Sequence, residues 1–435
     1  MRTLIFPVLL VAAPFFGPMA AGGEWPEFRG PWGNGYASAP GSTKPLGLPL
    51  RWSETENVTW KTAIPHRGWS TPVVMGGQVW LTTATEGGHD FFVVCVDAAS
   101  GKILLNRKLF HCDKPEPLGN NVNRYASPSA AIEPGRVYVH FGSYGTACLD
   151  TATFEVLWQR TDLPCRHYRG PASSVILFEN LVVLSFDGVD VQYTAALDKK
   201  TGRTVWKADR STVWRDIQAD GKPFREGDYR KAFCTPLIVD VGGKPLMISL
   251  GAKAGFAYDP RTGREVWKVR HHSHSSAPRP VFADGRVYIT TGHGRTEMWA
   301  IRVDGQGDVT DSHVVWKFGK GVPATASPLL VDGLIYMVTD GGALTCLEAA
   351  TGTRVWKHSI GGNYAASPIY ADGRLYFLNQ RGKTTVLKPG RTFEVLAVNK
   401  LAGGFMASPA VVGKALLLRT RTHLYRIETA GPPRR

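Results

Sequence analysis

The chain has 435 residues, 43% of them hydrophobic, with 48 glycines and 29 prolines. Its apolar content is enough for a large core, and the glycine and proline content predicts many turns. The formal net charge is +15, but the lysines and arginines are scattered and form no block, which argues against a nucleic-acid partner. Length alone suggests two or three domains, although a repeat architecture can hold this many residues in one closed unit.

The first 22 residues have the parts of a secretory signal peptide. Arg2 precedes an apolar run over residues 4–16, and small residues follow at 20–22. The run contains prolines and is short for a membrane span, so we favour cleavage over a retained anchor, and no later segment reaches that length. The first cysteine is Cys95, which argues against bacterial lipidation of this end. We predict a secreted or periplasmic protein without a transmembrane segment.

Residues 23–56 are predicted to form an extended arm, because the repeats begin only after them. The repeats are marked by a step of a small residue, Ser or Thr, and Pro, at intervals of mostly about 40–50 residues, which is the range of propeller blades. The step occurs at Ser70-Thr71-Pro72, Ala126-Ser127-Pro128, Cys234-Thr235-Pro236, Ala326-Ser327-Pro328, Ala366-Ser367-Pro368 and Ala407-Ser408-Pro409, with weaker forms at Gly170-Pro171 and Ala277-Pro278.

Each step is followed by short runs rich in Val, Ile, Tyr and Trp, separated by Asp-Gly and Thr-Gly turns that are typical of β-hairpins. No helical periodicity is present. The pattern predicts four strands per unit and an all-β, eight-bladed β-propeller, with seven blades as the alternative if a weak unit is miscounted. The fourth run of a unit ends in a tryptophan at Trp158, Trp206, Trp267, Trp316 and Trp356, and units one and seven place Leu105 and Leu396 there.

The last unit, which begins at Ala407, contains only three predicted strands before the chain ends. Residues 57–64, around Trp60, have the pattern of the missing fourth strand. An open array would leave two rows of unpaired backbone groups, and closing the ring removes them. We therefore predict a single propeller domain over residues 57–431, in which the N-terminal strand completes the last blade.

The runs "DKKTGRTVW" (198–206), "DPRTGREVW" (259–267) and "EAATGTRVW" (348–356) resemble the repeat of PQQ-binding-like propellers. That superfamily includes quinoprotein alcohol dehydrogenases and BamB-like assembly proteins, and "WPEFRGPWGNG" (25–35) is similar to a leader found in it. The resemblance covers nearly all of the chain after the signal peptide, and it is specific for the fold and poor for the activity. The tryptophan carries a large apolar surface and one donor, which suits packing between adjacent blades.

Strand direction assigns the loops to two faces. The turns between the first and second and between the third and fourth strands are short, whereas the opposite face receives the long loops, and we expect the site there. Aromatic rings and cations near the channel mouth favour a planar or anionic ligand, although the rings could also simply plug the mouth. The candidate ligand-binding residues are Trp69, Arg124, Tyr125, His167, Tyr168, Arg169, Asp187, Asp190, Arg230, Phe233, His272 and His274.

The function hypothesis is a monomeric, noncatalytic binding or assembly scaffold of the cell envelope, whose partner is an envelope protein or an anionic or planar small ligand. The alternative is a quinoprotein dehydrogenase that depends on PQQ and calcium; a hydrolase or lyase is a third hypothesis. The resemblance implies a pair of adjacent cysteines beneath the quinone of such dehydrogenases, and this chain has no Cys-Cys step. We predict no catalytic residue, no metal ligand and no cofactor.

A histidine cluster, an acidic loop and two cysteines are further candidate sites. His271, His272 and His274 lack an adjacent Cys, Asp or Glu, so a metal site is not favoured. Residues 304–311, "DGQGDVTD", lack the alternating acids of a calcium loop and are predicted to extend a hairpin. Cys112 and Cys165 lie in irregular loops on one face and are candidates for a disulfide, because the predicted compartment is oxidising.

Overall fold

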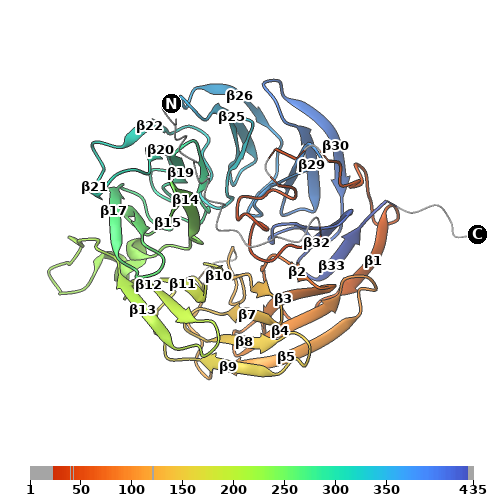
Figure 1. Cartoon of the computed structure of the whole chain (residues 1–435), viewed down its shortest axis with the longest axis horizontal. Coiled ribbons are helices and arrows are strands. Elements are labelled where there is room, and N and C mark those ends of the chain that lie inside the picture. The colour runs from red at the N-terminus through yellow and green to blue at the C-terminus, as the bar shows by residue number, and fades with distance from the viewer. Residues whose placement is uncertain (1–22, 40, 43, 120–121, 430–435) are drawn as a thin grey trace, which may run out of the picture.

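The computed structural model describes residues 23–39, 41–42, 44–119 and 122–429; the predicted signal peptide lies outside them. Eight antiparallel sheets surround a central axis as the blades of a propeller (Figure 1). The 3-10 helix η1 (Phe224–Arg230) is the one helix within these residues. The predicted eight-bladed β-propeller is therefore confirmed, and the seven-bladed alternative is wrong. None of the helical structure described is long and apolar enough to cross a membrane.

In each blade the first strand lies nearest the axis and the last strand lies at the rim (Figure 1). Blade 1 has strands β2 (Val73–Met75), β3 (Gln78–Ala84), β4 (Asp90–Asp97) and β5 (Ile103–His111). Blade 2 has strands β6 (Ala131–Glu133), β7 (Arg136–His140), β8 (Thr146–Asp150) and β9 (Val156–Arg160). Blade 3 has strands β10 (Ile176–Phe178), β11 (Leu181–Asp187), β12 (Gln192–Asp198) and β13 (Thr204–Asp209).

The next four blades repeat this order. Blade 4 has strands β14 (Leu237–Val241), β15 (Lys244–Leu250), β16 (Ala254–Tyr258) and β17 (Glu265–Arg270). Blade 5 has strands β18 (Val281–Ala283), β19 (Arg286–Thr290), β20 (Met298–Arg302) and β22 (Val314–Phe318). Blade 6 has strands β23 (Leu329–Val331), β24 (Leu334–Val338), β25 (Ala343–Glu348) and β26 (Arg354–Ser359). Blade 7 has strands β27 (Ile369–Ala371), β28 (Arg374–Leu378), β29 (Lys383–Lys388) and β30 (Glu394–Lys400).

Blade 8 joins the two ends of the propeller domain. Its strands β31 (Ala410–Val412), β32 (Ala415–Arg419) and β33 (His423–Ile427) come from the end of the chain, and β1 (Val58–Ala63) forms the outer edge. Strand β1 is antiparallel to β33, with Trp60 opposite Arg426 and Lys61 opposite Tyr425. The predicted closure by the N-terminal strand is confirmed, and it leaves no blade short of a strand.

The segment around residues 304–311 extends a hairpin and also pairs with the neighbouring blade. Strand β21 (Gly307–Asp308) pairs in parallel with β17 of the preceding blade, with Gly307 opposite Trp267. Strands β20 and β22 on either side of the insertion are antiparallel neighbours, so the predicted extended hairpin is present, and β21 in addition gives blade 4 a fifth strand. The physical reason is that the insertion crosses the gap between blades and covers the open edge of β17, which would otherwise keep unpaired backbone groups.

Neighbouring blades are joined by the tryptophans of the repeat. Each indole Nε1 donates to a backbone carbonyl oxygen in the next blade, at 2.9–3.2 Å. At four of these six tryptophans, a glycine of the next blade's turn approaches the ring closely: Gly202 has φ +70, and a Cβ there would lie 2.7 Å from the Trp158 ring. The six bonds are Trp60 to Ala98, Trp158 to Lys199, Trp206 to Pro260, Trp267 to Val303, Trp316 to Ala349 and Trp356 to Gly390.

The N-terminal arm crosses the inner strands and reaches the axis. Trp25 pairs with Val74 of β2 through two backbone hydrogen bonds of 2.9 and 2.8 Å. Further along, the buried Arg29 donates to the carbonyl oxygens of Pro328 at 2.6 Å and Pro368 at 3.2 Å. The arm then follows blade 7, where the backbone of Leu48 donates to Asp372 at 2.7 Å. It therefore closes the channel from the side of the short turns.

All six cysteines are free thiols. Cys165 is buried in the core of blade 3, 3.7 Å from Nδ1 of His167, whereas Cys112 packs against the separate core shared by blades 1 and 2. The candidate disulfide between them is therefore wrong for this structure, because the two side chains belong to different hydrophobic clusters.

Candidate functional site

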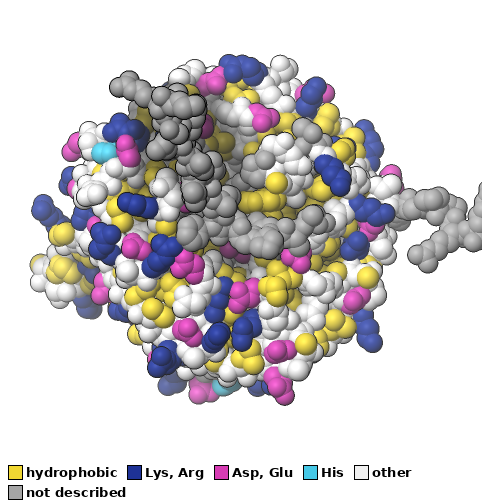
Figure 2. Space-filling model, viewed as in Figure 1, with side chains coloured by type: hydrophobic (Ala, Val, Ile, Leu, Met, Phe, Trp, Pro, Cys, Tyr) yellow, Lys and Arg dark blue, Asp and Glu magenta, His cyan; other side chains and the backbone are white. Residues whose placement is uncertain are grey.

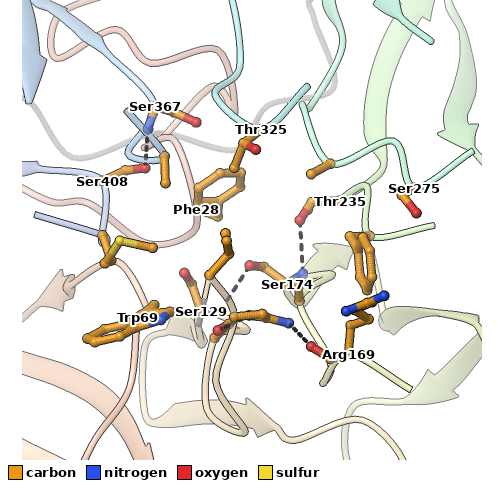
Figure 3. Close-up of a pocket in the computed structure, with 18 of the residues that line it drawn as sticks. Phe28, Trp69, Ser129, Arg169, Ser174, Thr235, Ser275, Thr325, Ser367 and Ser408 are labelled. Atoms are coloured by element: carbon orange, nitrogen blue, oxygen red, sulfur yellow. Dashed lines mark hydrogen bonds between the residues drawn. The ribbon is translucent and has the colours of Figure 1, made fainter. Parts of the chain in front are cut away.

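A cavity of about 440 Å³ lies on the axis at the face of the long loops. All eight interblade loops contribute to its wall. Phe28 of the arm also lines it and lies in the middle of the ring of side chains in Figure 3. Two loops between second and third strands add His293 and Asp340. The cavity is therefore open toward the face of the long loops, where the site was predicted, and the arm closes it from the other side.

A ring of hydroxyl groups surrounds Phe28 (Figure 3). Each member stands two residues before an innermost strand. Five members donate their backbone N–H to the hydroxyl oxygen of the next member, at 2.9–3.0 Å. A hydroxyl that accepts an N–H still has its own proton to donate. The hydroxyl ring consists of Thr71, Ser129, Ser174, Thr235, Ser327, Ser367 and Ser408, all of which line the cavity.

The eighth position of the ring is occupied by Arg279, which replaces a hydroxyl residue. Its side chain is directed to the arm: Nη1 donates to the Glu27 carboxylate at 2.7 Å and to the carbonyl oxygen of Phe28 at 2.6 Å. Burial raises the pKa of Glu27, and the charge of Arg279 opposes that rise. This contact holds Phe28 in position at the bottom of the cavity.

Two cations in the cavity wall share one carboxylate. Lys231 Nζ donates to the Asp228 carboxylate and, at 2.7 Å, to the backbone carbonyl oxygen of Asp228. Arg169 Nη2 lies 3.9 Å from the other carboxylate oxygen of Asp228. The three side chains together carry a net positive charge beside the cavity, where weak solvation strengthens electrostatic attraction.

Two further guanidinium groups are buried near the axis without a salt bridge to any described carboxylate. Arg419 donates to the carbonyl oxygens of Ser70 at 3.0 Å and Thr82 at 3.2 Å. The acceptors of Arg29 are the carbonyl oxygens of Asn34, Pro328 and Pro368. Burial lowers the pKa of each to about 9, so both remain charged at neutral pH. The buried groups around the cavity therefore favour a negative charge inside it.

Of the twelve residues proposed from the sequence, four line the cavity: Trp69, Arg169, Phe233 and His274. Arg124 lies behind Trp69, with its guanidinium carbon 5.7 Å from the centre of the indole ring. His274 stacks on Tyr229 with ring centroids 4.2 Å apart. These side chains come from separate interblade loops, and the propeller brings them to a common wall.

Three more of the twelve lie outside the cavity lining. Tyr125 is buried, and its hydroxyl donates to the carbonyl oxygen of Glu116 at 2.9 Å. His167 is also buried and accepts the Ser143 N–H on Nε2 at 3.1 Å; burial lowers its pKa to about 4. Tyr168 lies outside the cavity lining, with the guanidinium carbon of Arg169 5.0 Å from its ring centre.

The remaining four make structural contacts. Asp187 forms a buried, two-bonded ion pair with Arg210, at 3.0 and 2.8 Å. The Asp190 carboxylate accepts backbone N–H groups, including that of Arg166 at 2.8 Å. Arg230 binds Asp216 through two bonds of 2.9 and 2.5 Å. His272 is exposed, and its carbonyl oxygen accepts from a lysine side chain.

Sequence reasoning missed Phe28, Arg279 and most of the hydroxyl ring as site residues. The recurring Ser/Thr before the first strand carried the signal for the ring, but the register differs in three units. In blade 2 the ring residue is Ser129 instead of Ser127, and in blade 3 it is Ser174, outside the Gly170-Pro171 step. In blade 5 the equivalent residue is Arg279, one residue after Ala277-Pro278. Nothing in the repeat indicated that the arm would place Phe28 there.

The cavity carboxylates are already engaged. The Asp228 carboxylate accepts from Lys231 and forms an ion pair with Arg169. The Asp340 carboxylate accepts from Thr325 Oγ1 at 3.0 Å and from the Ala324 N–H at 3.3 Å. Among the described residues, no group of three or more His, Cys, Asp or Glu side chains has a geometry that could hold a metal ion. This donor set does not fit the several oxygen ligands that calcium requires.

The family described as "Outer membrane protein assembly factor BamB" matches residues 52–234 and 254–392. The chain belongs to this family. No curated protein matches the chain.

Solved structures share the fold of this family member at low sequence identity. BamB from Moraxella catarrhalis aligns with a TM-score of 0.56 and 11% identity, over 85% of this chain and 99% of that one. A europium-containing methanol dehydrogenase aligns at 0.69 and 12%, over 93% and 91%. The quinohemoprotein alcohol dehydrogenase from Comamonas testosteroni aligns at 0.63 and 13%, over 95% and 82%. Since assembly proteins and dehydrogenases share the architecture, fold alone does not assign an activity.

Proposed function

We propose that this member of the BamB family is an exported, noncatalytic binding or assembly propeller of the cell envelope, which holds an anionic group of its ligand or partner in the central cavity. The observation that carries the proposal is the composition of the wall: a ring of hydroxyl donors, with Arg169 and Lys231 beside it. Charged donors and hydroxyls of this kind pair with carboxylate, sulfonate or phosphate oxygens. Trp69 and Phe233 add aromatic surface for a planar portion of the ligand.

The second candidate is the quinoprotein dehydrogenase, which the two dehydrogenase neighbours keep under consideration. It requires a metal beside the quinone and a carboxylate that acts as a general base. Asp228 and Asp340 are the cavity carboxylates, and both are bound by protein donors. The arrangement therefore favours binding without turnover, and no step of a dehydrogenase reaction is assigned to these residues.

The test uses 8-anilinonaphthalene-1-sulfonate, a planar anion whose fluorescence rises on binding. We expect it to bind the wild-type protein and to lose at least about tenfold in affinity, or about 1.4 kcal/mol, in R169A. R166A is the matched control, since Arg166 is three residues away, exposed and outside the cavity lining. Equal affinity in the wild type and R169A, with melting temperatures unchanged, would contradict the cavity assignment.

The same preparation separates the two functions. PQQ and calcium are added together, and alcohol-dependent reduction of an electron-accepting dye is measured. The scaffold proposal expects no dye reduction above the rate without protein. Sustained turnover that depends on both additions would replace the proposed function with the dehydrogenase.

A further inference from the structure

Lys231 differs from every other described lysine in its burial. Its side chain is 3% exposed, and it is the one lysine among the described residues that is fully buried, yet it lines the cavity. It directly follows helix η1, whose last residue, Arg230, is tied to Asp216. The backbone that carries Lys231 is therefore anchored, and the amine is held beside the cavity.

The surroundings of the amine favour its neutral form more than water would. Burial lowers the pKa of Lys231, and the nearby charge of Arg169 acts in the same direction, whereas Asp228 opposes them. Asp228 is placed to receive a proton, because its carboxylate accepts directly from Nζ. Lysines in such settings are the ones that react as nucleophiles with carbonyl compounds.

We propose that Lys231 captures a small anionic aldehyde or 2-oxo acid as a reversible imine inside the cavity. The ammonium group gives a proton to Asp228, and the neutral Nζ attacks the carbonyl carbon. Asp228 returns its proton to the hydroxyl group of the resulting carbinolamine, which leaves as water, so that a C=N bond replaces the C=O bond. No electron acceptor or donor is needed, and addition of water releases the ligand unchanged.

The other cavity groups define the class of ligand. Arg169 and the hydroxyl ring provide donors for the anionic group, so this inference rests on the anion binding of the proposed function. The volume of about 440 Å³ limits the ligand to a small molecule or the end of a chain. Because Lys231 and Arg169 share Asp228, the carbonyl carbon and the anionic group must be close together in the ligand.

The experiment traps the imine with borohydride. The purified protein is incubated with glyoxylate, or in a parallel arm with pyridoxal 5′-phosphate, then reduced, and the adducts are located by peptide mass mapping. We expect Lys231 to be labelled at aldehyde concentrations at least about tenfold below those that label other lysines. K231R should lose this adduct, whereas K253R should keep it, because Lys253 is half-buried beside Tyr229 but outside the cavity lining.

A neutral aldehyde separates capture from simple lysine reactivity. Acetaldehyde should label Lys231 at least about tenfold less efficiently than glyoxylate in the wild type, a comparison that needs no variant. Labelling spread over the surface lysines without preference for Lys231 would overturn the inference. If the sulfonate probe binds the cavity and no Lys231 adduct forms, the imine is wrong and the proposed function stands; if neither occurs, both fail.

Discussion

At the scale of single residues, equivalent positions of the repeat carry side chains that make different contacts around the cavity. Seven positions of the ring carry hydroxyl side chains, six of which accept a backbone N–H from the neighbouring blade. The eighth position carries Arg279, which binds the arm. A buried guanidinium needs several acceptors, and Arg279 finds them in Glu27, Phe28 and Pro236. One substitution in the ring thus couples the arm to the channel.

Buried histidines give the protein an expected acid sensitivity. Burial lowers the pKa of His140 to about 3, of His167 to about 4 and of His271 to about 3. The unfolded chain takes up protons below about pH 6.5, whereas the folded chain resists until about pH 4. The free energy of unfolding should therefore fall as the pH drops from about 6.5 to 4, by up to about 1.4 kcal/mol per pH unit for each histidine.

Urea unfolding at several pH values measures this dependence. H167Q should reduce the slope between pH 6.5 and 4.5, since glutamine can still accept the Ser143 N–H but does not titrate. A free energy of unfolding that is constant over this range would show that the three rings titrate normally.

At the scale of elements, the seam between blades joins a tryptophan to a glycine turn. A side chain at Gly202 would meet the Trp158 ring at 2.7 Å, and φ at this glycine is +70. Gly285 has nearly the same φ, +68, but no atom lies within 4 Å of its added Cβ. The two glycines therefore separate backbone strain from the clash with the ring.

Alanine at these two glycines tests the seam. G285A should lower the free energy of unfolding by about 1–2 kcal/mol, through backbone strain alone. G202A should cost about 1–3 kcal/mol more, because the methyl group forces the ring of Trp158 away from its place. Chemical denaturation of both variants measures the difference. An equal decrease in the free energy of unfolding would show that the contact with the Trp158 ring does not contribute to stability.

The blades, the register of the hydroxyl ring and the arm differ in how well the sequence predicts them. Thr-Gly turns and strand-ending tryptophans predict the blades well, since each follows from local chemistry. The register of the inner ring is harder, because Ser127-Pro128 imitates the step while the strand begins at Ala131. Asp187 was proposed as a ligand residue, and its partner Arg210 lies 23 residues away, a pairing that no local pattern reveals. The arm has no periodicity, so its path to the axis could not be predicted.

At the scale of the whole molecule, closure gives the propeller two unlike faces. Strand β1 completes blade 8, and the arm that precedes it covers the axis from the short-turn side. On the face seen in Figure 2, cationic and acidic side chains alternate around the rim and form no single charged block. The net charge of +15 thus does not by itself locate the site, whereas the buried cations around the cavity do.

Hydrogen exchange measured with and without the sulfonate probe tests whether the ligand binds at the face of the long loops. We expect slower exchange in the interblade loops that line the cavity, at residues 122–129, 228–235 and 273–277, and no change in the short turns at residues 76–77 and 284–285. Protection of the short turns, with the cavity loops unchanged, would contradict this expectation.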